Sequence, residues 1–102
     1  MLKNTITENY NYKVIKADCV VENTKKYFNV TLELLDDSGK SNGTISDSIT
    51  ANPGVRLREF ALAQGLTTET LVSEPNCALG LTGICVASKS KDGTWLQVEK
   101  YC

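Results

Sequence analysis

The stretch YFNVTLELL (Tyr27–Leu35) decides the fold of this chain, because its side chains alternate between polar and apolar. Successive side chains of a β-strand point to opposite faces of a sheet, so the pattern predicts a strand with one buried face. The side chains that we expect in the core are Phe28, Val30, Leu32 and Leu34. The side chains that we expect on the outward face are Tyr27, Asn29, Thr31 and Glu33.

Four further segments are rich in the β-branched and apolar residues that favour strands. They are Tyr12–Val21, Thr44–Thr50, Gly80–Ser88 and Trp95–Tyr101. The residues that we expect on the inner side of the first three strands are Ile15, Ala17, Cys19, Val21, Ile45 and Ile49, besides those of Tyr27–Leu35. In the last strand we expect Leu96 and Val98 on the inner side, and Trp95, Gln97, Glu99 and Tyr101 on the outer side.

One helix is expected between the third and fourth strands. Asn52-Pro53 combines a favoured N-cap with a favoured first helical residue, and Gly65 can end a helix in the left-handed conformation. An apolar stripe at helical spacing is formed by Leu57, Phe60 and Ala61, whereas Val55 and Leu62 lie off it. The segment Thr67–Ser73 can add one or two further helical turns.

The expected order is therefore β-β-β-α-β-β in an all-β fold with one helix. Five strands with a helix between the third and the fourth are typical of the OB fold, so we predict a five-stranded OB-like β-barrel. Residues 1–102 fit one domain with one core, in which residues 1–11 are expected to form a flexible N-terminal arm.

Composition and charge limit the classes of function. The net charge is −1, so the protein as a whole does not attract phosphate. No apolar run approaches the length needed to cross a membrane, and no signal peptide is visible, so we expect a cytoplasmic protein. The cysteines are too widely spaced for a zinc ribbon; Cys19 and Cys85 are expected as small buried residues, and Cys102 as an exposed thiol.

The sequence indicates a protein without catalytic activity. It contains no histidine and no nucleophile elbow, and no pattern of metal ligands, so we expect neither a catalytic site nor a metal or another cofactor. The string DSGKSNG resembles the end of a phosphate-binding loop, but the glycine needed five residues before Gly39 is replaced by Leu34.

Lysines and outward aromatic residues provide the candidate site. Lysine pairs fall in the two connections that flank the usual oligonucleotide face of an OB fold, and bases stack on aromatic rings. The predicted nucleic-acid-binding residues are Lys25, Lys26, Tyr27, Lys89, Lys91, Trp95 and Tyr101. The same residues also fit the alternative that loop lysines are merely solvated and that the aromatic rings cover the ends of the barrel.

Three stretches carry a resemblance to a known family: YKVIKADCVVENTKKYFNVTLELLD, ITANPGVRLREFALAQGL and GLTGICVASKSKDGTWLQVEKY. They span most of the chain from Tyr12 onward, with Thr-Lys-Lys before the second strand and Leu-x-Gly opening the fourth. In these features the chain resembles a family of small bacteriophage OB-fold proteins grouped with phage single-stranded DNA-binding and recombination proteins.

The resemblance implies a single-stranded DNA-binding protein of phage type that supports replication or recombination in the host cytoplasm. The alternative is a protein-binding module of the same fold, such as a phage inhibitor of a host defence or replication protein. Such a module would use exposed strand edges, or Val55 and Leu62, for contact. A homo-oligomer is a further open alternative, and a membrane partner is not expected.

Overall fold

The computed structural model describes residues 5–51, 54–90 and 96–102 of the chain. Most of them form five strands: β1 (Thr5–Glu22), β2 (Lys25–Leu35), β3 (Ser41–Thr50), β4 (Thr82–Ser90) and β5 (Leu96–Tyr101). Between β3 and β4 lie the helices α1 (Val55–Ala63) and α2 (Thr68–Ser73) and the short 3-10 helix η1 (Pro75–Ala78). The predicted mostly-β chain with helical structure after the third strand is confirmed.

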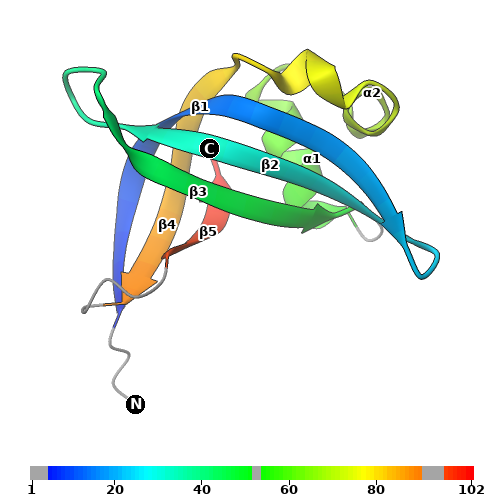
Figure 1. Ribbon diagram of the computed structural model, residues 1–102, viewed down its shortest axis with the longest axis horizontal. Helices are drawn as coiled ribbons and strands as arrows, with labels where there is room; N and C mark the ends of the chain where they lie inside the picture. Colours follow the sequence, from blue (N-terminus) through cyan, green and yellow to red (C-terminus); the bar gives the residue numbers. More distant parts are fainter. Residues whose placement is uncertain (1–4, 52–53, 91–95) are drawn as a thin grey trace.

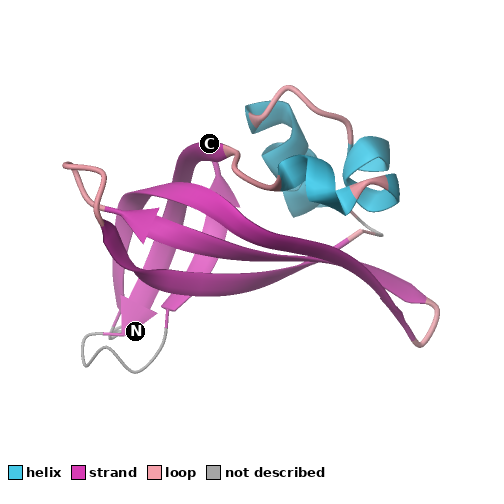
Figure 2. Cartoon of the chain, turned by 45° about the horizontal axis from the view of Figure 1, so that its top comes forward, coloured by secondary structure: helices cyan, strands magenta, loops and turns pink. Residues whose placement is uncertain are grey.

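The strands form one antiparallel sheet in the order β3-β2-β1-β4-β5, which curls into a half-barrel around α1 (Figure 1). β1 is the spine of this sheet, because its first half pairs with β4 and its second half pairs with β2. Figure 2 shows the helices at one end of the curled sheet, and the β1–β2 turn projecting away from its centre.

The inner face of β1 differs from the predicted set. The pairing with β2 shifts by one residue between Val14 and Lys16, so Ile15 is the extra residue of a β-bulge. Before the bulge Val14 is buried, after it Ala17 is buried, and Ile15 itself is 45% exposed. The predictions that Ile15 and Val21 belong to the core are therefore wrong, since Val21 lies beyond the core on the projecting hairpin.

The predicted flexible arm is also wrong for the residues that the structure describes. Thr5 to Asn11 are part of β1 and pair with β4 from Ser90 to Ile84. The pairing includes a contact between the hydroxyls of Thr7 and Ser88 at 3.1 Å. The segment forms a strand because a distant part of the chain supplies its hydrogen-bonding partner, although its own composition is polar.

Aromatic rings from strands and helix meet at the centre of the core. Phe60 of α1 lies 5.9 Å from Phe28 and 5.0 Å from Tyr101, measured between ring centroids. Tyr12 of β1 packs edge-on against Tyr101 at 5.8 Å. These four side chains join β1, β2, β5 and α1, so α1 is held inside the curl of the sheet by ring packing.

The sequence pattern predicts that Tyr101 points outward, and this prediction is wrong. Tyr101 lies in the core, with 4% of its surface exposed. The pairing of β5 with β4 shifts between Val86 and Ala87, whose partners are Lys100 and Val98. Glu99 is thus the extra residue of a second bulge, which turns both Val98 and Tyr101 inward. A strict alternation cannot show such a reversal.

Helix α1 ends as the sequence predicts. Gly65 has a φ of +69°, its N–H bonds to the carbonyl of Leu62, and the N–H of Leu66 bonds to the carbonyl of Ala61. This pair of bonds is the Schellman motif that terminates helices at glycine. The predicted start at Asn52-Pro53 lies outside the described residues. The predicted apolar stripe of Leu57, Phe60 and Ala61 is buried.

Gln64, just past the end of α1, ties that helix to two strands. Its amide nitrogen donates to the hydroxyl of Tyr12 at 2.8 Å and to the carbonyl of Thr82 at 3.0 Å. Gly83 lies directly beneath, and a Cβ there would come within 2.7 Å of the Tyr12 hydroxyl and 2.8 Å of the Gln64 amide. Glycine is needed at this position because the two side chains occupy its space.

The four cysteines are free thiols. Cys85 is buried, as predicted, and burial raises the pKa of its thiol to about 11. Cys19 is only half-buried, whereas Cys77 and Cys102 are exposed, which confirms the prediction for Cys102.

The turn between β2 and β3 is organised by one carboxylate. The Oδ1 atom of Asp36 accepts hydrogen bonds from the Ser38 hydroxyl at 2.7 Å, the Ser38 N–H at 2.9 Å and the Lys40 N–H at 2.9 Å. These bonds, the one from the Ser38 hydroxyl foremost, hold the pKa of Asp36 below its ordinary value. The turn is therefore stabilised by the ionised form of Asp36.

We expect Asp36→Ala to lower the stability of the protein at neutral pH. Because the folded-state pKa is depressed, the contribution of Asp36 is full above the pKa of the unfolded chain and is lost as pH falls through the folded value. The stability difference between wild type and variant, measured by urea unfolding, should shrink below about pH 4. Asp36→Asn, which keeps an acceptor oxygen without charge, is the matched control, and a difference independent of pH would contradict the role of the ionised carboxylate.

Candidate functional site

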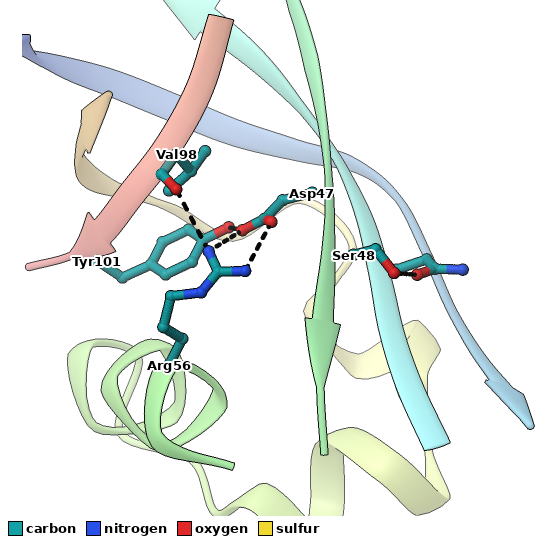
Figure 3. A network of polar contacts seen from close by, with 6 residues as sticks. Asp47, Ser48, Arg56, Val98 and Tyr101 are labelled. Atoms are coloured by element: carbon teal, nitrogen blue, oxygen red, sulfur yellow. Dashed lines mark hydrogen bonds and ion pairs between the residues drawn. The ribbon is translucent and has the colours of Figure 1, made fainter. Parts of the chain in front are cut away.

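The two edge strands of the half-barrel, β3 and β5, approach each other without a backbone ladder between them in the described part of the chain. Side chains join them instead (Figure 3). The Tyr101 hydroxyl donates to Oδ2 of Asp47 at 2.6 Å, and Arg56 donates to both carboxylate oxygens of Asp47 at 2.9 and 3.0 Å. Arg56 also donates to the Val98 carbonyl at 3.4 Å. We call this group of Asp47, Arg56, Val98 and Tyr101 the β3–β5 seam.

Because the β3–β5 seam is largely buried, its polar groups depend on one another for hydrogen bonds and charge compensation. Asp47 is 9% exposed, so its charge depends on the bidentate guanidinium of Arg56 for compensation. The hydrogen bonds to Asp47 raise the pKa of Arg56 above its ordinary value. Burial, reinforced by the nearby Asp47 charge, raises the pKa of Tyr101, so its hydroxyl stays protonated and donates. Sequence reasoning missed Asp47, since a lone aspartate between serines carries no local signal of such a partner.

The opposite side of the sheet presents a polar surface, and Figure 3 shows Ser48 on the other side of β3 from Asp47. Three strands contribute to this outer face, which consists of cross-strand rows of directly paired residues. The rows are Lys13–Glu33–Thr44, Lys16–Thr31–Ser46, Asp18–Asn29–Ser48 and Val20–Tyr27–Thr50. The predicted outward orientation of the polar residues of β2 and β3 is confirmed.

The middle of the outer face is hollowed into a groove of about 380 Å³. Most of its lining comes from the two central rows, Lys16–Thr31–Ser46 and Asp18–Asn29–Ser48, and the neighbouring strand residues Val30 and Asp47 complete it. Small hydroxyl and amide side chains leave the backbone of β2 and β3 within reach of a flat ligand. The groove is therefore an open, polar hollow whose side chains can form hydrogen bonds with a ligand that lies across the sheet.

The charges on the outer face balance. Lys13, Lys16 and Lys25 point to this side, and so do Asp18, Glu22 and Glu33 by the same alternation. Among the described residues, none of these six charges forms an ion pair within the face. The outer face therefore has no net positive potential, and an anionic chain is attracted only at the positions of the individual lysines.

The predicted lysines do not form one cluster. Lys26 pairs with Val21 at one end of β1, and Lys89 pairs with Ile6 at the other end. Lys25 is on the outer face beside Glu22, whereas the next residue, Lys26, is turned to the inner side and lines a pocket against α2. Lys89 follows the inward alternation of Ala87 and is half-buried. Lys91 lies outside the described residues.

The predicted aromatic residues are separated as well. Tyr27 is half-buried on the outer face, in the row between Val20 and Thr50. Tyr101 belongs to the β3–β5 seam in the core, so its predicted role as an outward stacking ring is wrong. Trp95 lies outside the described residues. Among the members of the predicted site that the structure describes, only Lys25 and Tyr27 lie together on one face.

Other kinds of site have little support in the described residues. No helix there is long and apolar enough to span a membrane, and no group of three or more cysteine or carboxylate side chains could hold a metal ion. A second hollow, of about 480 Å³, lies between the β1–β2 hairpin and α2. Its floor includes Ala51, Leu57 and Val72, and its rim carries Lys26 and Glu69.

Comparisons of the chain with protein-family models, with curated proteins and with solved structures found no match.

We expect Asp47→Ala to destabilise the protein by about 2–4 kcal/mol, because it leaves the Arg56 guanidinium and the buried Tyr101 hydroxyl without their acceptor. Urea unfolding followed by circular dichroism measures the loss. Ser46→Ala, one row away on the outer face of the same strand, should change stability by no more than about 0.5 kcal/mol. Equal stabilities of the Asp47 and Ser46 variants would contradict the importance of the seam.

Proposed function

We propose that the protein is a non-catalytic single-stranded DNA-binding protein with an OB-like fold. The arrangement of the strands supports the fold: a long β1 shared by two halves of the sheet, the order β3-β2-β1-β4-β5, and α1 inserted between β3 and β4. OB folds are partly open five-stranded barrels that bind oligonucleotides on the face of their second and third strands.

The observation that carries the proposal is the composition of the corresponding face in this chain. The outer face of β2 and β3 is hollowed, and the groove is lined by hydroxyl and amide groups together with the charged side chains of Lys16 and Asp18. Tyr27 stands at one side of the groove, and Lys16 stands within it. A ring for stacking and a cation for phosphate on one face are the two features that non-specific binders of single strands use.

Bound DNA would cross the outer face with one base stacked on Tyr27 and with phosphates near Lys13, Lys16 and Lys25. The predicted contact at Lys89 would lie on β4, away from β2 and β3, and Lys26 would reach the DNA strand only from the edge of the β1–β2 hairpin. Because acidic side chains stand between the lysines, we expect modest affinity that depends on salt.

The resemblance to phage proteins supports a place for this activity in phage replication or recombination, in the cytoplasm of the host. The role would be to hold single strands, without chemistry on them.

A salt titration tests the electrostatic part of the proposal. The affinity for a labelled mixed-sequence single strand of about 16 nucleotides should fall with log salt at a slope of about −2, since each of three lysine–phosphate contacts contributes about −0.7. Lys16→Ala combined with Lys25→Ala should flatten the slope to about −0.7. Lys100→Ala, an exposed lysine on β5, is the control and should leave the slope unchanged. The matching duplex should bind more weakly, and equal binding of both forms would contradict a single-strand site.

Tyr27→Ala tests the stacking part. We expect the affinity to fall at least about fivefold, because a base stacked on an aromatic ring contributes about 1–3 kcal/mol, while the salt slope stays the same. Tyr27→Phe keeps the ring and should bind like wild type. An Ala variant that folds and binds normally would remove Tyr27 from the interface. Fluorescence anisotropy measures affinity, and circular dichroism checks the fold.

The second candidate function is a protein-binding module, such as an inhibitor of a host defence or replication protein. It is favoured by the exposure of two large apolar side chains on α1, Val55 at 65% and Leu62 at 73%. They are seven residues apart and therefore lie on the same side of the helix. A correctly folded protein without affinity for single strands at low salt would favour this second function.

A further inference from the structure

We propose that Asp18 and Asn29 form a base-reading pair that favours bases with an exocyclic amino group over thymine. The inference rests on the proposed single-stranded DNA-binding function, and deepens it by naming the residues that give the site a preference among bases.

The two side chains stand opposite each other in the groove. Asp18 of β1 and Asn29 of β2 are direct cross-strand partners on the outer face, and both line the groove. Directly opposed side chains of antiparallel strands start about 4.5–5.5 Å apart, which is close enough for one ligand edge to meet both.

Each side chain is held by one of its two polar atoms. Oδ1 of Asp18 accepts the backbone N–H of Cys19 at 2.9 Å. Oδ1 of Asn29 accepts the hydroxyl of Ser48 at 2.6 Å, which directs the amide oxygen toward β3. The amide nitrogen of Asn29 is therefore on the side of the amide group that does not contact Ser48.

The other two polar atoms have no hydrogen-bond partner among the described residues. They are Oδ2 of Asp18, which is an acceptor, and Nδ2 of Asn29, which is a donor. No hydrogen bond joins them to each other, so both remain available to a ligand in the groove. An acceptor next to a donor is complementary to an edge that presents a donor next to an acceptor.

Cytosine presents that edge with its N4 amino group and N3, and adenine presents it with its N6 amino group and N1. Carboxylates accept from the cytosine amino group in known protein–DNA contacts. Guanine offers its N2 amino group and N1–H to a carboxylate. Thymine has no amino group. Its N3–H and one neighbouring carbonyl can also meet the acceptor and the donor, but its second carbonyl oxygen then faces the Asp18 carboxylate and repels it, whereas the amino groups of cytosine and adenine bring no such oxygen to that side. Thymine is therefore the base that this pair disfavours.

The neighbouring rows complete the subsite. Lys16 is in the row on one side of the pair, and Tyr27 is in the row on the other side. A base read by Asp18 and Asn29 would thus lie next to a ring that can stack the adjacent base and a cation that can contact a phosphate. In this arrangement Asp18 acts on the base edge, although its charge repels the backbone.

The test compares labelled homopolymers of cytosine and thymine of equal length by fluorescence anisotropy at low salt and neutral pH. We expect wild type to bind the cytosine strand at least about fivefold more tightly. Asp18→Ala should lower the affinity for cytosine, raise it for thymine, and bring the ratio close to one. Asp18→Asn, which keeps an acceptor without charge, should give an intermediate ratio. Glu33→Ala removes an acid from the same face outside the central rows, and should strengthen both affinities while leaving the ratio unchanged.

Equal affinities of wild type for the two homopolymers would overturn the base-reading pair and leave the proposed function standing, provided that the mixed-sequence strand binds. A ratio that Asp18→Ala leaves unchanged, with both affinities raised together, would reduce Asp18 to a simple repulsive charge and overturn the inference. Failure of every single strand to bind would overturn the proposed function as well. Asp18 is exposed, and circular dichroism checks that each variant folds.

Discussion

The half-barrel depends on a single buried carboxylate between its two edge strands. Asp47 receives the Tyr101 hydroxyl from β5 and the Arg56 guanidinium from α1, so one side chain connects three elements that the sheet leaves apart. An inward-pointing charge on an edge strand also discourages pairing with a foreign strand. The same residue therefore closes the curl of the sheet and protects its edge. The contacts that join the two edge strands lie on the inner side of the sheet, so the side chains of the polar outer face are not needed to close the half-barrel.

The sequence predicts the parts of the fold that follow a regular period. β2 alternates from Phe28 to Leu34 because one face is buried along its whole length, and Gly65 marks the end of α1 by its own backbone preference. The pattern fails where an extra residue reverses it, at Ile15 in β1 and at Glu99 in β5. It also fails for Asp47, whose partners come from distant segments.

In the candidate site, too, features that follow the alternation of a strand could be predicted, whereas features that depend on a bulge or on pairing between strands could not. The outward hydroxyl-rich face of β3 and the position of Tyr27 could be predicted, because they depend on alternation alone. The separation of adjacent lysines could have been inferred as well, since Lys25 and Lys26 must point to opposite sides of one strand. The burial of Tyr101 could not, because it depends on the second bulge. The opposition of Asp18 and Asn29 depends on the register between β1 and β2, which the first bulge shifts.

The division of β1 between two partners has a consequence during synthesis. Its second half pairs with β2, its neighbour in sequence, so this pairing can form before β4 has been synthesised, whereas its first half has no partner until β4 is present. Pairings between distant segments form slowly, and a waiting strand is open to aggregation. From Thr7 to Asn11 this unpaired half of β1 carries mostly polar side chains, so it exposes little apolar surface to other nascent chains. The polar composition that prevents this strand from being predicted from the sequence thus also lowers the tendency of the incompletely folded chain to aggregate.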